Sequence, residues 1–304
     1  MNFIKNKIKA IKDLKVQGAE NIAKTAVLIL KKRVDKSTAL TKTRLLSELE
    51  KTKHELFKTR PTEPLMRNTL NYILCNLKGR DIDELKESFY SNADNTLKHF
   101  QSVEKSIASI GANKIRNGMV IFTHCHSSTV INILKKAKQM KKSFEVHNTE
   151  TRPLFQGRTT AKELSKLKIP VTHYVDSAMR LALKKADIVL LGADAITPEK
   201  AINKIGSEAI AELANKYDIP VYVCCDSWKF DYHTIFGFEE EIELRKDKEI
   251  WKNAPKNVKI CNYAFEKIDL NLVTAIISEI GDYRPSVFIE EIKRNNDWMC
   301  NNNL

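Results

Sequence analysis

The chain has 304 residues, of which 42% are hydrophobic and 29% charged, with only 9 glycines and 8 prolines. This usage is typical of a globular protein and excludes a fibrous repeat or a disordered chain. No apolar run approaches the roughly 20 residues that cross a bilayer, and the lysine-rich N-terminus lacks the apolar core of a secretory signal. We therefore expect a soluble, cytoplasmic protein that does not contact a membrane.

The net charge is +13, and residues 1–60 alone hold 16 Lys and Arg against 6 Asp and Glu. A basic segment of this kind can bind nucleic acid or attract anions. Lysine is abundant along the whole chain, however, and no aromatic residues are interleaved with the basic ones. The charge pattern is that of solvated helix faces, so we do not expect nucleic acid as a partner.

Residues 1–115 are predicted to form a helical N-terminal domain. Apolar residues recur at three- and four-residue spacing within 8–16, 20–34 and 40–57. Two prolines interrupt the pattern between Lys58 and Pro64. Helices are then expected to resume at 66–74 and to continue with a long helix from about Asp81 to Ile115.

Residues 116–304 are predicted to form a Rossmann-like domain, because short apolar runs alternate there with amphipathic stretches. The runs typical of strands are 119–123, 144–148, 170–175, 187–192, 220–225 and 273–279. The helical stretches are 130–142, 160–168, 177–186 and 207–217, and a short C-terminal helix is expected to end near Trp298. Thr160 and Glu163 have the spacing of a capping box for the second of these helices. The fold class is therefore α/β, with a parallel sheet covered on both faces.

Polar residues follow several of the predicted strands, and ligands bind outside the carboxyl ends of the strands in such sheets. Cys125 follows the first strand and precedes a helix, whose N-terminal field would lower the pKa of the thiol and favour a thiolate. Alternatively, Cys125 is a small buried residue at a strand end. His124 and His126 would lie on one side of an extended segment and Cys125 on the other, so we expect no metal site. None of the six cysteines forms a CxxC pair, which indicates reduced thiols.

Hydroxyl and guanidinium groups follow the first two strands. Ser127, Ser128 and Thr129 begin a predicted helix, where they suit either a bound phosphate or ordinary N-capping. Arg152 follows the second strand, where its planar guanidinium could bind a phosphate in bidentate fashion or form an ion pair with Glu150.

Asp194 follows the most apolar strand, where desolvation would favour the protonated carboxyl and suit it to act as an acid. The alternative for Asp194 is a helix cap. Asn203 and Lys204 are expected to open the next helix, and Lys229 adds a cation after a further strand. Together these residues predict one cleft for an anionic small molecule.

Several blocks of sequence resemble those of the superfamily that contains the alpha, beta and delta subunits of translation initiation factor 2B and related sugar-phosphate isomerases. These blocks are THCHS at 123–127, TETRP at 149–153, PVTHYVDSA at 170–178, GADAIT at 192–197 and INKIG at 202–206. Within the superfamily, the blocks are most similar to those of the archaeal ribose-1,5-bisphosphate isomerases. The resemblance implies a helical domain followed by a Rossmann-like domain.

The resemblance also implies a reaction, the conversion of ribose 1,5-bisphosphate to ribulose 1,5-bisphosphate in nucleotide salvage. Asp194 would protonate the ring oxygen and open the sugar, and the Cys125 thiolate would take the C2 proton to give an enediolate. The residues implied in binding the two phosphates are Arg60, Arg152, Asn203, Lys204 and Lys229. No cofactor is expected.

Two departures from the family pattern affect the expected phosphate site. Relatives carry an arginine-led RGAG cradle near the N-terminus, whereas this chain has Gln17, Gly18, Ala19 and Glu20. A cation is lost and an anion is gained, which would weaken phosphate binding unless Glu20 points away. Ser128 also stands where some relatives have a lysine.

Two alternatives to this activity remain open. A non-catalytic regulatory subunit, similar to those of factor 2B, is favoured by the segment from Gln17 to Glu20 and opposed by the pairing of Cys125 with Asp194. A methylthioribose-1-phosphate isomerase would need an apolar pocket for the thioether and only one phosphate site. Because members of the superfamily form dimers or dimers of trimers, we expect a homo-oligomer.

Overall fold

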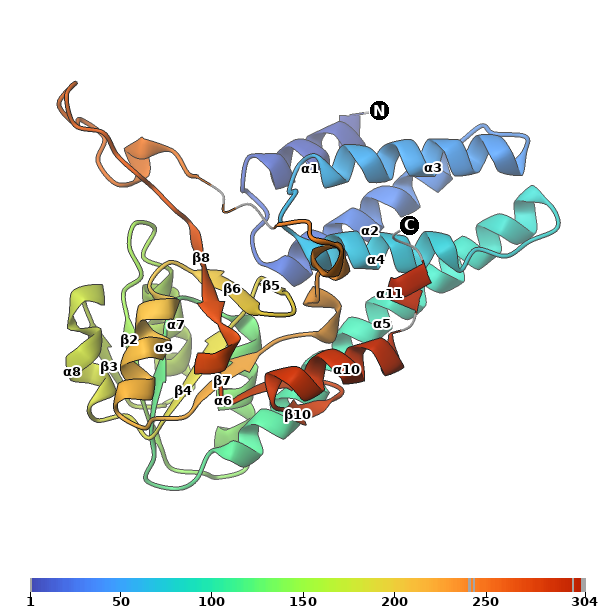
Figure 1. Cartoon of the computed structure of the whole chain (residues 1–304). Helices are drawn as coiled ribbons and strands as arrows, with labels where there is room; N and C mark the ends of the chain where they lie inside the picture. The colour runs from blue at the N-terminus through green and yellow to red at the C-terminus, as the bar shows by residue number, and fades with distance from the viewer. Residues whose placement is uncertain (1, 240–241, 243, 297, 302–304) are drawn as a thin grey trace. The chain divides into compact units, whose positions relative to one another are not determined.

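The computed structural model describes the chain except for residues 1, 240–241, 243, 297 and 302–304. It divides into two compact units, which we describe separately (Figure 1). Unit 1 comprises Met1–Ser102, Trp228–Tyr232 and Asn296–Leu304, and unit 2 comprises Val103–Ser227 and His233–Asn295. No described helix combines the length and the apolar composition that a membrane-spanning segment requires.

Unit 1 is built from helices, as the sequence predicts. They are α1 (Asn2–Lys12), α2 (Ala19–Lys36), α3 (Lys42–Phe57), α4 (Pro64–Cys75), the first part of α5 (Ile82–Lys114) and α11 (Trp298–Asn301). Helix α2 packs against α1, α3 and α4, because its apolar stripe is buried among theirs. Pro64 occupies the first turn of α4, where its missing N–H costs no hydrogen bond.

Unit 2 contains a seven-stranded sheet in the order β10-β9-β7-β4-β1-β2-β3. Its strands are β1 (Val120–Thr123), β2 (Glu145–Thr149), β3 (Val171–Tyr174), β4 (Ile188–Gly192), β7 (Val221–Cys224), β9 (Ala275–Ser278) and β10 (Gly281–Tyr283). Every neighbouring pair is parallel except β9 and β10. The six predicted strands all occur in this sheet, so the predicted α/β fold class is confirmed.

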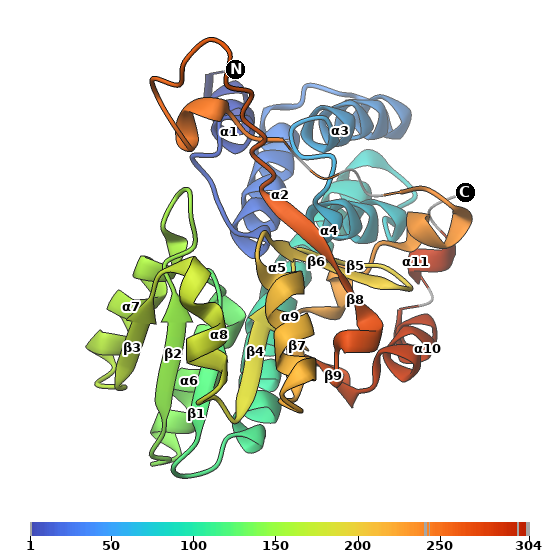
Figure 2. The same ribbon diagram turned by 60° about the vertical axis from the view of Figure 1, so that its left-hand side comes forward.

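Helices cover both faces of the seven-stranded sheet (Figure 2). They are α6 (Ser128–Gln139), α7 (Gln156–Lys166), α8 (Met179–Leu183) and α9 (Ser207–Lys216), with α10 (Pro285–Asn295) beside β9 and β10. Figure 2 shows α8 and α9 in front of the sheet and α6 behind it. Ile121, Leu134, Leu164 and Leu190 are fully buried in one cluster on the α6 and α7 side. Burial of each such side chain stabilises the fold by about 1.5–3 kcal/mol.

A second sheet of three antiparallel strands was not predicted. Its strands are β5 (Ala195–Ile196), β6 (Lys200–Lys204) and β8 (Phe265–Asp269), in that order. The prediction that Asn203 and Lys204 open a helix is therefore wrong. They end β6, and the next helix, α9, begins at Ser207. The hairpin was missed because β5 has only two residues and because lysines occur in β6 and β8.

Two helix boundaries also differ from those predicted. Helix α7 begins at Gln156, after Phe155 in a left-handed conformation, so Thr160 lies inside the helix and does not cap it. The expected C-terminal helix is two helices, because α10 ends at Asn295 and α11 begins at Trp298.

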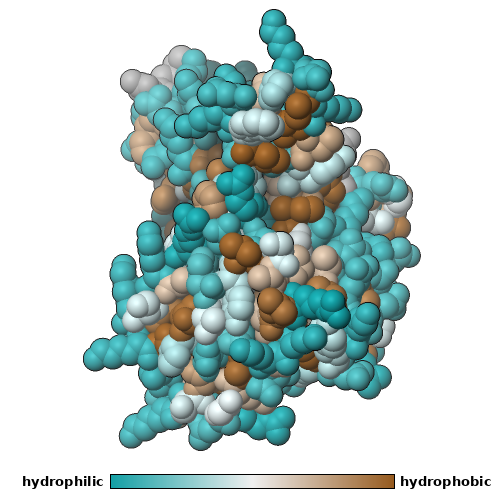
Figure 3. Space-filling model, turned by 90° about the vertical axis from the view of Figure 1, so that its left-hand side faces the viewer, coloured by the Kyte–Doolittle hydropathy of each residue, from teal (hydrophilic) through white to brown (hydrophobic). Residues whose placement is uncertain are grey.

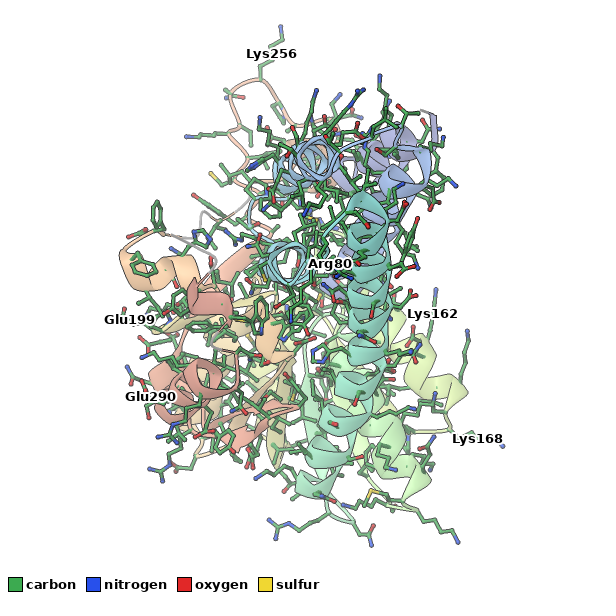
Figure 4. All side chains as sticks on the ribbon, turned by 90° about the vertical axis from the view of Figure 1, so that its right-hand side faces the viewer. Arg80, Lys162, Lys168, Glu199, Lys256 and Glu290 are labelled. Atoms are coloured by element: carbon green, nitrogen blue, oxygen red, sulfur yellow. The ribbon has the colours of Figure 1, made fainter. Side chains whose placement is uncertain are left out.

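Several lysine side chains lie on the surface of the molecule. The labelled Lys162, Lys168 and Lys256 project away from the ribbon in Figure 4, and all three are exposed. On the face drawn in Figure 3, hydrophilic residues predominate and hydrophobic residues form small separate patches. The positive charge of the chain is thus carried at least in part by solvated side chains.

Candidate active site

Cys125 and Asp194 follow neighbouring parallel strands of unit 2. Cys125 lies two residues after β1, and Asp194 lies two residues after β4, which pairs directly with β1. From β1 the chain continues to β2 on one side, and from β4 it continues toward β7 on the other. This reversal of direction opens a crevice at the carboxyl ends of the strands, the usual ligand site in such sheets.

The backbone at Cys125 is unusual and is held at both of its peptide groups. Its φ angle is 66°, in the left-handed region. Its N–H donates to Oγ1 of Thr151 at 3.0 Å, and its carbonyl oxygen accepts from Oγ1 of Thr160 at 2.7 Å. Two threonine hydroxyls from outside the β1 loop therefore support this conformation.

The environment of the Cys125 thiol favours its neutral form. The pKa of Cys125 is raised to about 11, chiefly by burial; the carboxylates of Asp194 and Asp176 act in the same direction, and the ammonium of Lys204 and the backbone N–H of His126 act against it. The expected lowering of this pKa is therefore wrong, because desolvation outweighs the nearby positive groups.

His124 and His126 point to different partners. The buried His124 has Nδ1 at 2.5 Å from Oγ1 of Thr149 and Nε2 at 2.9 Å from the carbonyl oxygen of Ile205. Since a carbonyl only accepts, Nε2 carries a proton, and burial lowers the pKa of His124 and keeps the ring neutral. His126 lies 3.1 Å through Nδ1 from Oγ1 of Thr160. The segment is not extended as expected, because Cys125 turns the chain.

The β5–β6 hairpin brings Asp194 close to Asn203 and Lys204. The Asp194 N–H donates to the Ile202 carbonyl at 2.8 Å, directly beside Asn203 on the opposing strand. Asn203 donates through Nδ2 to Oγ of Ser207 at 2.9 Å. The Lys204 side chain is 6% exposed, and its Nζ lies 4.7 Å from the centre of the Phe265 ring.

Arg152 is exposed at the end of the loop that follows β2. Its Nη2 lies 3.3 Å from the carbonyl oxygen of Ile250, and its guanidinium is 5.1 Å from the centre of the Phe155 ring. Glu150, the partner considered for Arg152, instead binds Arg158 at 2.8 Å. The Arg152 guanidinium is thus held by a carbonyl and a ring, both contacts that a phosphate can replace.

Asp176, which was not predicted, orders the loop that carries Arg152. Its Oδ1 accepts from the Thr151 N–H at 2.8 Å, and its Oδ2 accepts from the Arg152 N–H at 2.7 Å. A cavity of about 220 Å³ lies beside it, lined by His124, Thr149, Arg152, Asp176, Met179, Ile205, Gly206 and Ile210. The cavity therefore combines one cation, one carboxylate, a neutral imidazole and three apolar side chains.

Of the three hydroxyl residues that follow His126, one caps α6 and the other two are its first residues. Oγ of Ser127 accepts from the Val130 N–H at 3.4 Å and caps α6, whereas Ser128 and Thr129 are its first two residues. A Cβ atom on Gly192 would lie 2.6 Å from Oγ of Ser127, so this approach of β4 requires glycine. Phosphate binding and N-capping were both considered for these hydroxyls, and Ser127 acts as an N-cap.

The N-terminus of α9 is already occupied by a carboxylate of the same chain. Oε1 of Glu266 accepts from the Glu208 N–H at 2.7 Å. Burial nevertheless raises the pKa of Glu266. Sequence analysis missed this residue because it lies far from α9 along the chain, in the unpredicted strand β8.

The remaining candidate residues belong to unit 1. Gln17 donates through Nε2 to the Leu14 carbonyl at 3.1 Å, Gly18 precedes α2 with φ 83°, and Ala19 is the first residue of α2. Glu20 forms an ion pair with Lys24 one turn along α2, so a cation offsets the charge gained there. Arg60 is buried with Nη2 3.7 Å from Oε2 of Glu63, and Lys229 ends a short 3-10 helix.

Three threonines of the site, Thr149, Thr151 and Thr160, were not predicted as site residues. The first two lie within the TETRP block, so a signal was present in the sequence. Thr160 gave a misleading signal, since its spacing from Glu163 indicated a helix cap.

The Initiation factor 2 subunit family model matches residues 15–285, so the chain belongs to that family. Ribose 1,5-bisphosphate isomerase from Thermococcus kodakarensis is 35% identical over 299 residues, which cover 95% of this chain and 93% of the relative. The corresponding protein from Methanocaldococcus jannaschii is 34% identical, with 98% and 97% covered. The solved translation initiation factor eIF-2B from Pyrococcus horikoshii OT3 superposes with a TM-score of 0.80 at 27% identity, covering 93% of this chain and 97% of that one.

Proposed function

We propose that this protein is a sugar-phosphate aldose–ketose isomerase that converts ribose 1,5-bisphosphate to ribulose 1,5-bisphosphate. The observation that carries the proposal is the placement of a thiol and a carboxyl, Cys125 and Asp194, after adjacent strands at the reversal point of the sheet. Identity of 35% with a ribose 1,5-bisphosphate isomerase along nearly the whole chain supports it. In this role the protein would act in the cytoplasm as a homo-oligomer.

The reaction needs one acid and one base near two neighbouring sugar carbons. In the proposed sequence, Asp194 gives a proton to the ring oxygen as the bond between C1 and that oxygen breaks, and the phosphate stays on C1. The Cys125 thiolate removes the proton from C2, and the electron pair of that C–H bond forms the C1–C2 double bond of an enol phosphate. Protonation at C1 and loss of the proton from the C2 hydroxyl give the ketose, so the product is an isomer and no redox partner is consumed. The Lys204 ammonium favours the thiolate against burial.

The direct test is turnover of ribose 1,5-bisphosphate by purified wild-type protein, Cys125→Ser and Asp194→Asn. We expect turnover by the wild type and a loss of at least about a hundredfold in kcat for each variant, as befits an acid and a base. Cys261→Ser is the matched control, since this thiol is exposed and lies in the segment before β8. An inactive wild type that still binds the sugar phosphate would overturn the enzyme proposal and favour a regulatory subunit.

A second candidate substrate is methylthioribose 1-phosphate. Met179, Ile205 and Ile210 line the cavity and offer an apolar surface on which a thioether could pack. A methylthioribose-1-phosphate isomerase from Thermosipho africanus is 34% identical to this chain, with 94% and 87% covered. The two substrates are distinguished by comparing kcat/KM for each with the same preparation. We expect the bisphosphate to be preferred, and a preference for the thioether would reverse the assignment.

A further inference from the structure

We propose that Thr151 and Thr160 are positioning residues that clamp the peptide groups on both sides of Cys125 and thereby aim its thiol. This inference rests on the proposed isomerase for its kinetic consequence. It also predicts an effect on the thiol that needs no substrate.

The clamp acts on a conformation that the chain does not favour by itself. Cys125 has φ 66°, a region in which a side chain with a Cβ atom is strained. Such a residue persists where surrounding contacts hold it. Both contacts come from distant segments, since Thr151 and Thr160 lie 26 and 35 residues further along the chain.

Both hydroxyls are buried, and their own partners fix their orientation. Thr151 is 0% exposed and Thr160 is 2% exposed. The Thr160 hydroxyl donates to the Cys125 carbonyl, so it must accept from Nδ1 of His126 at 3.1 Å, which assigns that ring proton to Nδ1. The Thr151 hydroxyl accepts from the Cys125 N–H and faces the Thr149 carbonyl at 3.4 Å. Neither hydroxyl can rotate away without losing a bond.

The clamp also connects Cys125 to the rest of the site. Thr151 is held through its N–H by Asp176, which lines the cavity, and Thr160 belongs to α7. The N–H of Cys125 therefore ties the loop after β1 to the loop after β2, and its carbonyl ties the loop after β1 to α7. Loss of either hydroxyl would let the Cys125 backbone move toward a relaxed conformation and displace the sulfur.

The experiment compares Thr160→Val, Thr160→Ser, Thr151→Val and Thr151→Ser with the wild type. Valine keeps the shape and removes the hydroxyl, whereas serine retains it. We expect each valine variant to lower kcat by about ten- to a hundredfold with KM changed less than twofold, and each serine variant to recover most of that loss. Thr172→Val is the matched control, because its hydroxyl bonds Glu145 in the same unit, away from Cys125.

A second readout is the rate at which iodoacetamide alkylates Cys125, measured with Cys75, Cys261 and Cys300 replaced by serine. We expect the valine variants at 151 and 160 to change this rate at least threefold, and Thr172→Val to leave it unchanged. A change in alkylation without isomerase activity in the wild type would retain the clamp and reject the proposed function. Equal behaviour of Thr160→Val and Thr172→Val in both readouts, or serine variants no better than valine, would overturn the clamp.

Discussion

The protonation state of one thiol decides how the proposed chemistry depends on pH. The pKa of Cys125 is raised to about 11, chiefly by burial. Its thiolate is therefore a minor species near neutral pH, but a strong base once formed. Only a small fraction of the enzyme then carries the thiolate, but each thiolate is more reactive toward a weakly acidic C–H bond.

We predict that the rate at which iodoacetamide alkylates Cys125 rises with pH between about 7 and 9.5, by close to tenfold per unit. The sign follows because the thiolate is the reactive form and its fraction grows tenfold per pH unit below the raised pKa. Alkylation of the protein with Cys75, Cys261 and Cys300 replaced by serine measures the slope. A rate that levels off below pH 9.5 would contradict the raised pKa.

A related prediction concerns Lys204, whose ammonium is the first group that opposes the raised pKa of Cys125. Lys204→Met keeps an apolar stem against Phe265 and removes the charge. We expect alkylation of Cys125 at pH 8 to slow at least threefold, because the thiolate loses the cation that lowers its pKa most. Lys162→Met, at an exposed position on α7, is the control and should leave the rate unchanged.

At the scale of elements, α7 meets the end of β2 through a glycine. A Cβ atom on Gly157 would lie 1.7 Å from the Thr149 carbonyl oxygen, closer than any real contact. The helix carries Thr160 one turn further on, so this approach also sets the distance from Thr160 to Cys125.

We predict that Gly157→Ala destabilises the protein by about 3 kcal/mol or more, since the helix must shift away from the strand. Urea unfolding measures the change, and kcat should fall with it because Thr160 moves. Gly118→Ala is the control. Its φ is 84° with open space around the added atom, so it should cost only about 1–2 kcal/mol of backbone strain. Equal costs for the two variants would contradict the tight packing.

Sequence patterns predicted the strands and helices whose apolar residues recur regularly, and they missed the strands that lack such a pattern. The strands of the large sheet are apolar runs such as Ile188–Gly192, and the helices carry apolar stripes, so both were found. The hairpin of β5 and β6 has no such run, and its pairing with β8 joins residues more than sixty positions apart. The locations of Cys125 and Asp194 after strands could be predicted, whereas the threonine contacts and the pKa of the thiol depend on packing that no local pattern records.

At the scale of the whole molecule, a half-buried glutamate beside a buried aspartate in unit 2 links stability to pH. Burial, together with the Asp226 carboxylate, raises the pKa of Glu279 to about 7. The Glu279 carboxylate accepts from the Ser227 N–H at 3.0 Å and also contacts the Ser227 hydroxyl. The folded protein therefore binds a proton at Glu279 more tightly than the unfolded chain does.

We predict that Glu279→Gln raises stability at pH 8 relative to pH 5, compared with the wild type. Because the folded pKa is raised, the stability that Glu279 contributes is present below about pH 4.5 and is lost as pH rises through about 7. The free energy of unfolding of the variant, minus that of the wild type, should therefore be larger at pH 8 than at pH 5. His124 has the opposite slope, since burial lowers its pKa, so only the difference between the two proteins is informative. Thermal unfolding at several pH values measures it, and parallel curves would refute the effect.

The left-handed backbone at Cys125 also limits how this chain can drift over evolutionary time. Glycine adopts φ 66° without strain, and asparagine does so more readily than most residues, so either could replace the cysteine while the surrounding loops keep their places. A descendant could thus lose its chemistry in one step and gain stability by doing so. The same fold would then persist as a binding protein, and the reverse path to an enzyme would require a cysteine to be accepted at a strained position.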